Sequence, residues 1–324
     1  MRFLLDYRIN SIFITKILFR IYTILVRNVY ILEYKKENNH YIPQFLLRQF
    51  RIPNTGNIYE YKISGLAKPI SIGKEAALIP DLYTTIDKAT KQKSSFIEKQ
   101  LFAFTLEKYA SRVISQLQKS PELDLTNIER SIITSFVAFQ YTRTPCYFAL
   151  IKLVIEYLHL GRKIPLDEIA NLDFCKNALF ANKYQISHKD LFSFGEKNNL
   201  KLTGAENLIL KIAIEAGNIL SQRIYKKSIG LVGVNTPGFF YLPDNPVGMI
   251  DTNNGEFIGT LFNEINENTL ICLPISPTQC LYYLESTSKI DPRVIGMIIS
   301  HCLKRNIFKF AYSDRDTKNI KGLF

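Results

Sequence analysis

Two helices meet in the stretch TNIERSIITSFVAFQYTRTP, which covers residues 126–145. Thr126 and Glu129 have the spacing of a capping box, in which each side chain bonds the main-chain N–H of the other residue. Apolar residues then recur every three or four positions, which is typical of a helix that buries one side. The stretch therefore predicts a helix that begins at Thr126 and ends near Arg143.

Helices are expected on both sides of this stretch. Downstream, Thr144 and Pro145 are typical of an N-cap and a first helical residue, so a helix is expected to begin there and to end at Gly161. Upstream, the capping box Ser95-Phe-Ile-Glu98 predicts a helix that runs to about Lys119. The other helical patterns are a long one over residues 204–226 and short ones within residues 162–202.

Short strands separated by turn residues predict the rest of the fold. Asn57–Ser64 alternates in the manner of a strand, and Pro69–Ile72 is its expected hairpin partner. A β-rich part begins at residue 228 and contains one helix, over residues 291–305. Long helices followed by clustered strands indicate an α+β fold, without the regular alternation of a parallel doubly wound sheet. The strands expected in the β-rich part are residues 229–234, 238–242, 269–273, 279–284 and 307–312.

The composition is that of a folded chain with a sizeable core. It has 324 residues, of which 47% are hydrophobic and 22% charged, which excludes disordered chains, collagen-like repeats and coiled-coil rods. Five cysteines are too few, and odd in number, for a disulfide scaffold. We expect an accessory segment, residues 1–38, and a single α+β domain over residues 39–324. The domain divides into a hairpin region at 39–80, a helical core of four long helices at 81–227 and a small, mainly antiparallel sheet at 228–324.

The positive charge is concentrated in the amino-terminal half. The formal net charge is +12, and residues 1–120 carry 19 basic side chains against 9 acidic ones. A basic surface attracts phosphate, either on a nucleic acid or on an anionic lipid. Tyr and Phe are plentiful in the same region, and aromatic rings among cations stack on bases. Solubility is the other explanation of such a surface, since no recognised nucleic-acid motif accompanies it.

The first 32 residues are apolar but punctuated by cations. Arg2, Lys16, Arg20 and Arg27 fall within roughly 40° of one another at 100° per residue. A helix with a narrow cationic stripe and a wide apolar face suits a membrane interface or a hydrophobic groove in a partner. The alternatives are an extension packed on its own domain, an addition upstream of the natural start, and a strand. No run of about 18 uncharged apolar residues is present, which argues against a spanning helix.

Charged side chains share the apolar sides of the first two helices. On the helix over 95–119, Glu98 lies on the same side as the stripe of Phe102, Leu106, Tyr109 and Val113, and Glu107 falls opposite, in solvent. On the helix over 126–143, Gln140 and Arg143 lie inside a stripe that contains Ile132, Phe136 and Phe139. A buried charge needs a partner, so each should find one.

Two interpretations of these buried groups remain open. In the functional one, Arg143 holds an anion and Glu98 acts as a base or an orienter in a preorganised polar site. In the structural one, Glu98 only caps its helix and Arg143 ties the loop that follows its own. His40 is a candidate catalyst or a satisfied hydrogen-bonding group, and Asp244 either closes a turn or adds a carboxylate near His40 and Glu98.

Several common sites are missing from the sequence. Phosphate-binding glycine loops, the Gly-x-Ser-x-Gly elbow, His-Glu-x-x-His and Cys-x-x-Cys do not occur, and the histidines and cysteines lack the spacing of metal ligands. No metal site is therefore predicted, and no cofactor is identified. Cysteine usage fits a reducing cytosol.

The segment NHYIPQFLLRQF, residues 39–50, opens a series of motifs that runs through the chain. With them, the chain resembles a bacterial family of uncharacterised proteins, the domain of unknown function 4238 family, over about residues 39–312. The resemblance implies no established activity. The other matching segments are Asn57–Tyr61, Asp81–Tyr83, Phe96–Glu98, Gln140–Pro145, Asp244–Pro246 and Leu273–Pro277; the polar motif positions are His40, Gln44, Arg48, Glu98, Gln140, Arg143 and Asp244.

Two functional hypotheses follow. The first is a cytoplasmic bacterial protein that binds or acts on a phosphate-bearing partner, such as nucleic acid or another polyanion, through its basic amino-terminal half. Hydrolysis would use His40, Glu98 and Asp244, and phosphodiester cleavage would call for a metal with carboxylate ligands. The ligand-binding candidates are Gln44, Arg48, Gln140 and Arg143. The alternative is a non-enzymatic interaction protein, peripheral to the inner membrane through residues 1–32. The oligomeric state is not predicted.

Overall fold

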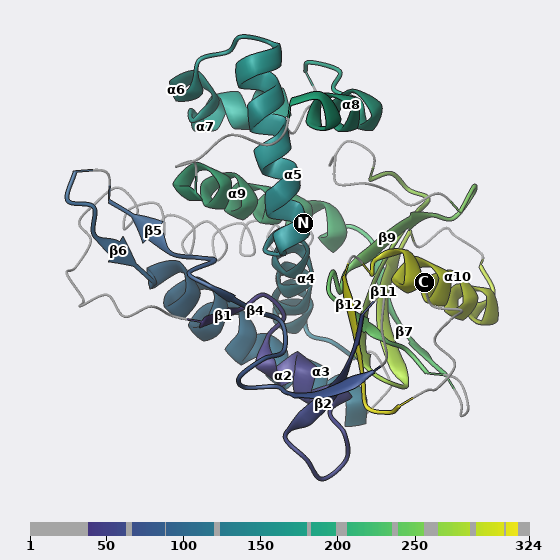
Figure 1. The fold of residues 1–324 in the computed structure, drawn as a ribbon. Helices are drawn as coiled ribbons and strands as arrows, with labels where there is room; N and C mark the ends of the chain where they lie inside the picture. Colours follow the sequence, from purple (N-terminus) through teal and green to yellow (C-terminus); the bar gives the residue numbers. More distant parts are fainter. Residues whose placement is uncertain are drawn as a thin grey trace. The chain divides into compact units, whose positions relative to one another are not determined.

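The computed structural model describes residues 38–62, 67–87, 89–119, 124–179, 183–198, 206–234, 239–255, 265–285, 290–307 and 309–316. The predicted amphipathic segment, residues 1–32, lies outside them. The fold is α+β, as predicted, with helices and several small antiparallel sheets (Figure 1). Internal contacts divide the chain into two compact units. The helical unit contains Ile79–Phe136 and the described residues before His40; the mixed unit contains His40–Leu78 and the chain from Val137 onward.

The helical unit is built on one long helical run preceded by short strands. Strand β1 (Asn38–His40) pairs with β4 (Leu78–Pro80), and β5 (Thr85–Ile86) pairs with β6 (Lys93–Ser94). The run consists of η2 (Ile97–Glu107) and α3 (Lys108–Lys119), so the extent of the helix predicted over 95–119 is confirmed. The predicted capping box at Ser95 and Glu98 is wrong, because the N-cap of η2 is Phe96 and makes no side-chain capping bond. The buried ring of Tyr83 meets that of Phe102 edge-on, with centroids 4.7 Å apart. Aromatic packing thus anchors the run to the segment before it.

The first part of this run is a π-helix, and that corrects one sequence expectation. In η2 the main chain bonds at i→i+5, as where the N–H of Lys108 donates to the carbonyl of Ala103. Such a ladder has more residues per turn than the 3.6 of an α-helix, so a stripe drawn at α-helical spacing drifts. Phe102, Leu106 and Val113 are buried as expected, whereas Tyr109, placed on the same stripe, is 39% exposed.

The capping box that begins α4 (Asn127–Thr142) is present as predicted. The N–H of Thr126 donates to Oε2 of Glu129 (2.9 Å), and the N–H of Glu129 donates to Oγ1 of Thr126 (3.2 Å). The Thr126 hydroxyl also donates to the same carboxylate, which lowers the pKa of Glu129. The ionised carboxylate is therefore the form that caps the helix.

Glu129→Gln is expected to destabilise the protein at pH 7 by about 0.5 kcal/mol, the low end for a cap, because the site is partly exposed. A carboxyl whose pKa is lowered by folding stabilises the native state above its unfolded pKa and loses that contribution as the pH falls through its folded pKa. The difference in melting temperature between the two proteins should therefore vanish in acid. A difference in melting temperature that persists at pH 3 would contradict this assignment. So would an equal loss of stability on Glu196→Gln, the control substitution at an exposed helix end.

Helices of the mixed unit pack closely around α5 (Pro145–Glu156), which continues as η3 (Tyr157–Gly161) and so ends where predicted. Thr144 caps α5 by accepting a hydrogen bond from the N–H of Tyr147. Long helix α9 (Glu206–Tyr225) contacts α5, and its Gly217 has no room for a Cβ against Phe139 and Thr142 of α4. The shorter elements are α6 (Leu166–Ile169), α7 (Leu172–Phe174), η4 (Cys175–Leu179) and α8 (His188–Asn198).

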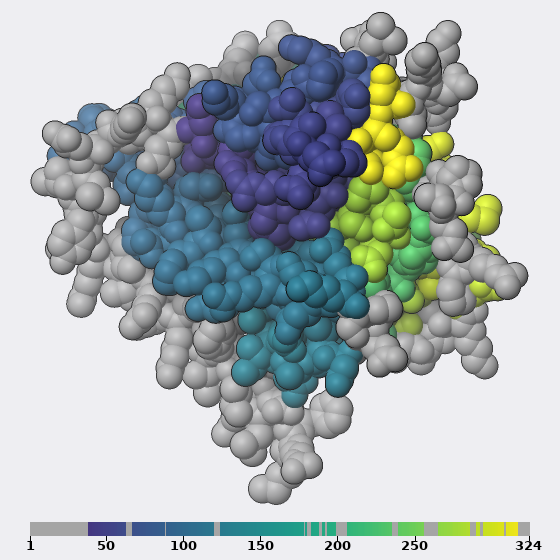
Figure 2. All heavy atoms as spheres, turned by 90° about the horizontal axis from the view of Figure 1, so that it is seen from below, coloured from purple at the N-terminus to yellow at the C-terminus, as the bar shows by residue number. Residues whose placement is uncertain are grey.

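Among its described residues, the mixed unit also contains two four-stranded antiparallel sheets. One has the order β7-β11-β10-β9 and the other β3-β2-β12-β8. The second sheet joins the predicted amino-terminal hairpin to the last strand of the chain, with Tyr61 opposite Ala311, and Figure 2 shows the two regions side by side. The strands of the first sheet are β7 (Ser228–Gly233), β9 (Gly248–Asp251), β10 (Thr269–Ser276) and β11 (Gln279–Leu284); those of the second are β2 (Asn57–Lys62), β3 (Lys68–Ser71), β8 (Leu242–Pro243) and β12 (Phe310–Ser313).

Helix α10 (Pro292–Arg305) covers one face of the first sheet (Figure 1). Its Ile299, Cys302 and Leu303 form a buried core with Leu270 and Cys272 of β10. Within the described residues, none of the helices has the length and apolar character that a membrane crossing requires.

Candidate functional site

The family motif at residues 39–50 folds into a short strand and a tight helical turn. Pro43 precedes helix α2 (Gln44–Leu47), and its carbonyl accepts the N–H groups of Leu46 and Leu47. Leu46, Leu47 and Phe50 are fully buried, which holds this segment in the core of the mixed unit. The polar side chains of the motif are thereby fixed at defined places.

Two side chains of α4 and the loop that follows hold the main chain of this segment. Nη2 of Arg143 donates to the carbonyl of His40 (2.6 Å), and Nε2 of Gln140 donates to the carbonyl of Tyr41 (2.8 Å). Arg143 is 2% exposed and Gln140 is 0% exposed, so the prediction that both lie on the buried stripe is confirmed. Sequence positions separated by about a hundred residues are thus joined at two successive carbonyls.

His40 and Asp244 also contact main chain. Nε2 of His40 donates to the carbonyl of Ile72 (3.0 Å), at the end of the β2–β3 hairpin. Oδ2 of Asp244 accepts the N–H groups of Lys309 (2.8 Å) and Phe310 (3.2 Å), while its own N–H donates to the carbonyl of Phe310. Asp244 therefore fixes the start of β12 beside β8, which fits the structural interpretation of this carboxylate.

A buried tyrosine pair extends the same cluster. Oη of Tyr41 lies 3.5 Å from Oη of Tyr312, and the Tyr312 hydroxyl accepts the N–H of Ala77 (3.2 Å). Burial raises the pKa of both phenols well above the usual value. The pKa of the Cys146 thiol is raised to about 12, mainly by burial and to a smaller extent by the charge of Asp244. These groups stay protonated at neutral pH, so neither a tyrosinate nor a thiolate is available there as a nucleophile.

The remaining predicted residues are Gln44, Arg48 and Glu98. Arg48 is exposed, and its Nη2 donates to Oε1 of Gln44 one helical turn earlier (2.8 Å). Glu98 belongs to the helical unit, near the start of η2, whereas His40 and Asp244 belong to the mixed unit. The structure therefore brings His40, Gln140, Arg143 and Asp244 into one unit but establishes no geometry that joins Glu98 to them.

A cationic and aromatic face lies on the helical unit. Every exposed charged side chain between residues 97 and 119 is basic: Lys99, Lys108, Arg112 and Lys119. Nζ of Lys108 lies 4.6 Å from the ring centre of Phe104, a side chain that is 55% exposed, and Arg112 lies 5.9 Å from the ring of Tyr109. We call Lys99, Phe104, Lys108, Tyr109, Arg112 and Lys119 the cationic face. The helical period does not reveal this face, because it places Tyr109 on the buried side.

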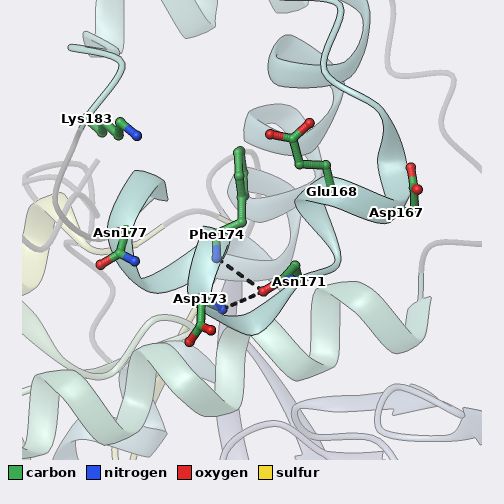
Figure 3. Close-up of a pocket in the computed structure, with 7 residues that line it drawn as sticks. All are labelled: Asp167, Glu168, Asn171, Asp173, Phe174, Asn177 and Lys183. Atoms are coloured by element: carbon green, nitrogen blue, oxygen red, sulfur yellow. Dashed lines mark hydrogen bonds between the residues drawn. The ribbon is translucent and has the colours of Figure 1, made fainter.

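An open hollow of about 450 Å³ in the mixed unit has the opposite charge. Asp167, Glu168 and Asp173 line it with Phe174 and Lys183, and Figure 3 shows these side chains around the short helices α6 and α7. The side chain of Asn171 caps α7 by accepting the N–H groups of Asp173 and Phe174. The hollow therefore disfavours a phosphate-bearing ligand.

Three buried cysteine thiols lie together in the mixed unit. Among the described residues, no three His, Cys, Asp or Glu side chains are arranged to hold a metal ion. Cys272, Cys280 and Cys302 are fully buried between β10, β11 and α10, and a Cβ at Gly248 would lie 2.6 Å from Sγ of Cys302. Hydrogen bonds from the Cys280 and Cys302 thiols lower the pKa of Cys272. Their full burial makes these thiols part of the core.

A comparison with known protein families identifies the family to which these motifs belong. The family model described as "Protein of unknown function (DUF4238)" matches residues 38–301. The chain belongs to this family. The DUF4238 match begins at β1 and ends in α10, so it contains all seven motif residues and the cationic face. No curated protein and no solved structure matches the chain significantly.

Proposed function

We propose that this DUF4238 protein binds a phosphate-bearing polymer, in the first place a nucleic acid, through the cationic face of its helical unit. The observation that carries the proposal is that all exposed charged side chains of η2 and α3 are basic. Nucleic-acid affinity arises largely from Lys and Arg side chains that replace counterions on phosphates. The net positive charge of residues 40–120, with 12 basic and 6 acidic side chains, supports the same reading.

The spacing of the cations on α3 fits a phosphate backbone. At 100° per residue, Lys108, Arg112 and Lys119 lie within roughly 40° of one another on the helix surface. Lys108 and Arg112 are about 6 Å apart along the axis at 1.5 Å per residue. That is close to two phosphate steps of about 3.4 Å along one strand of a duplex. The two cations can therefore contact two phosphates that lie two steps apart along one strand.

The exposed aromatic rings supply the second component. Bases stack on aromatic side chains in proteins that bind single strands, without regard to sequence. Phe104 is exposed and lies beside Lys108, so a base on this ring would bring its phosphate toward the cations. The proposal is therefore for single-stranded nucleic acid and for weak sequence preference.

The proposal covers binding and leaves hydrolysis out. His40 and Asp244 hold main-chain groups of the mixed unit, and Glu98 lies in the other unit. The rival hypothesis, association with an anionic membrane, depends on residues 1–32, which lie outside the described residues. Flotation with anionic liposomes, with and without residues 1–38, separates it from the cationic face, because removal of that segment leaves the face intact.

The test is binding of the full chain to single-stranded RNA and DNA across a salt series. We expect retention on filters at low salt and an affinity that falls steeply as salt rises, with a slope of about −2 to −3 for three or four phosphate contacts on a single strand. Binding that is flat in salt, or no retention at 50 mM salt, would overturn the proposal.

A further inference from the structure

Two cysteine sulfur atoms, one on a strand and one on a helix, flank the same point in the core of the mixed unit. Gly248 of β9 lies opposite Cys272 in the register of β9 and β10. A Cβ on Gly248 would lie 3.0 Å from Sγ of Cys272 and 2.6 Å from Sγ of Cys302, which belongs to α10. Glycine at this position therefore leaves the space in which the two sulfurs approach each other.

The strand register separates the third thiol of this cluster, Cys280, from Cys272. Cys280 lies opposite Pro274, two positions along the β10–β11 ladder from the partner of Cys272. Diagonal neighbours in such a ladder are about 7–8 Å apart, whereas the Cα atoms of a disulfide are about 4.4–6.8 Å apart. The register therefore disfavours a bond between the two strand cysteines and leaves Cys302 as the partner of Cys272.

The three thiols differ in their readiness to react. Hydrogen bonds from the thiols of Cys280 and Cys302 and from the N–H of Gly248 lower the pKa of Cys272. The pKa of Cys280 is raised, mainly by burial, and that of Cys302 is raised, mainly by its hydrogen bond to Cys272. The thiolate is the nucleophilic form of cysteine. Cys272 is therefore the attacking sulfur, and the other two thiols stay protonated.

A buried amide lies beside these sulfurs. Asn306, which follows α10, is fully buried, and within the described residues neither its Nδ2 nor its Oδ1 has a hydrogen-bond partner. Its Nδ2 lies 2.8 Å from the same Cβ position on Gly248. An unpaired buried amide costs free energy, so this one favours the formation of a polar group next to it. A sulfenic acid, the first product of thiol oxidation, is such a group, because its hydroxyl both donates and accepts.

We propose that Cys272 and Cys302 form a reversible disulfide when a hydroperoxide oxidises the protein. The Cys272 thiolate attacks one oxygen of hydrogen peroxide, the O–O bond breaks, and hydroxide leaves as the sulfenic acid forms. Sγ of Cys302 then forms the S–S bond and displaces that hydroxyl, which leaves as water with the Cys302 proton. Two thiols are oxidised and one peroxide is reduced to two waters. The site is independent of the cationic face, which belongs to the other unit.

The end of α10 provides the access that fully buried thiols need. Cys302 lies in the last turn of this helix, where Lys304 and Arg305 are exposed. Helix ends open locally at a lower free energy than the core of a domain. Hydrogen peroxide is little larger than water, so opening of this turn is sufficient to admit it. The disulfide then ties the last turn of α10 to β10.

The test is peptide mapping by mass spectrometry of the full, reduced chain after treatment with hydrogen peroxide. Remaining thiols are alkylated under denaturing conditions, and the chain is digested without reductant. We expect a peptide that links Cys272 to Cys302, lighter by two hydrogen atoms than its reduced parts and removed by dithiothreitol. The melting temperature should rise by several degrees, because the bond closes a loop of about 30 residues.

Single variants separate the roles of the residues. Cys302→Ala should leave Cys272 as a sulfenic acid that dimedone traps, whereas Cys280→Ala, the control that removes an equally buried thiol, should still form the link. Asn306→Ala should slow the link several-fold without lowering the melting temperature, which loss of a structural contact would lower. Circular dichroism melting of each reduced variant checks that it folds.

Three results would overturn the proposal. The first is the absence of the Cys272–Cys302 peptide from the oxidised native protein. The second is a link from Cys272 to Cys280 in its place, and the third is loss of the link in a folded Cys280→Ala protein. An unchanged rate of oxidation in Asn306→Ala would contradict the positioning role of that amide.

Discussion

Arg143→Met is expected to lower the free energy of unfolding by about 2–3 kcal/mol, the cost of losing a buried hydrogen bond from a charged donor. The Arg143 side chain is almost fully buried, and its Nη2 lies 2.6 Å from the carbonyl oxygen of His40. Methionine preserves much of the length and apolar contact, so the loss reports mainly on the polar contact. Urea denaturation monitored by circular dichroism measures it directly.

Arg48→Met is the matched control. Arg48 also donates to a neighbouring group, Oε1 of Gln44, but it is exposed, so its loss should change stability by less than about 0.5 kcal/mol. Equal effects of the two substitutions would show that burial is not the source of the stabilisation. A fully stable Arg143→Met protein would contradict the structural role assigned to this motif residue and would favour a role in holding an anion.

Neutralising two cations of the cationic face is expected to weaken single-stranded RNA binding by about tenfold or more at 100 mM salt. Lys108→Gln with Arg112→Gln removes two phosphate contacts on neighbouring turns of α3. Each contact contributes about 0.7 to the salt slope on a single strand, so the slope should fall by about 1.4. Fluorescence anisotropy of a labelled oligonucleotide across a salt series measures both quantities.

Lys197→Gln with Lys226→Gln provides the control of equal charge. Both lysines are exposed and both belong to the mixed unit. This variant should keep the affinity within about twofold and keep the slope, because attraction by net charge alone is a minor part of contact with phosphates. If the two double variants behave alike, the cationic face has no special role.

Much of the fold was predictable from local signals. The capping box at Thr126 and the Thr144-Pro145 pair mark helix starts through hydrogen bonds that depend only on neighbours in sequence. The strand predicted over 279–284 coincides with β11 because its β-favouring side chains and the turn residues around it are also local signals. Membership of the family was also predictable, since it rests on short motifs.

Long-range pairing was not predictable in the same way. The joining of the hairpin to β12 depends on residues about 250 positions apart, and β9, buried on both sides, lacks an alternating pattern. The expected strand at 238–242 is reduced to Leu242–Pro243 within the described residues. The π-helical bonding in η2 could not be foreseen either, because the apolar residues of this segment also recur at the spacing of an α-helix.

The candidate site was predicted in part. Burial of Gln140 and Arg143 followed from the helical period of α4, but their partners, the carbonyls of His40 and Tyr41, lie in a distant segment. Nothing in residue spacing tells a side chain that binds main chain from one that binds a ligand. The cationic face was anticipated only as an excess of basic residues in the first 120 positions.

The chain contains no tryptophan, which allows the most direct test of the nucleic-acid proposal. Phe104→Trp places the only tryptophan of the variant, which can be excited selectively over the tyrosines, on the cationic face at a position exposed enough to accept the larger ring. Addition of oligo(U) at low salt should quench its emission as bases stack on it, and salt should restore the emission, whereas Leu160→Trp in the mixed unit should remain unquenched. Quenching confined to the Leu160→Trp protein, or none in the Phe104→Trp protein while anisotropy reports binding, would contradict the account.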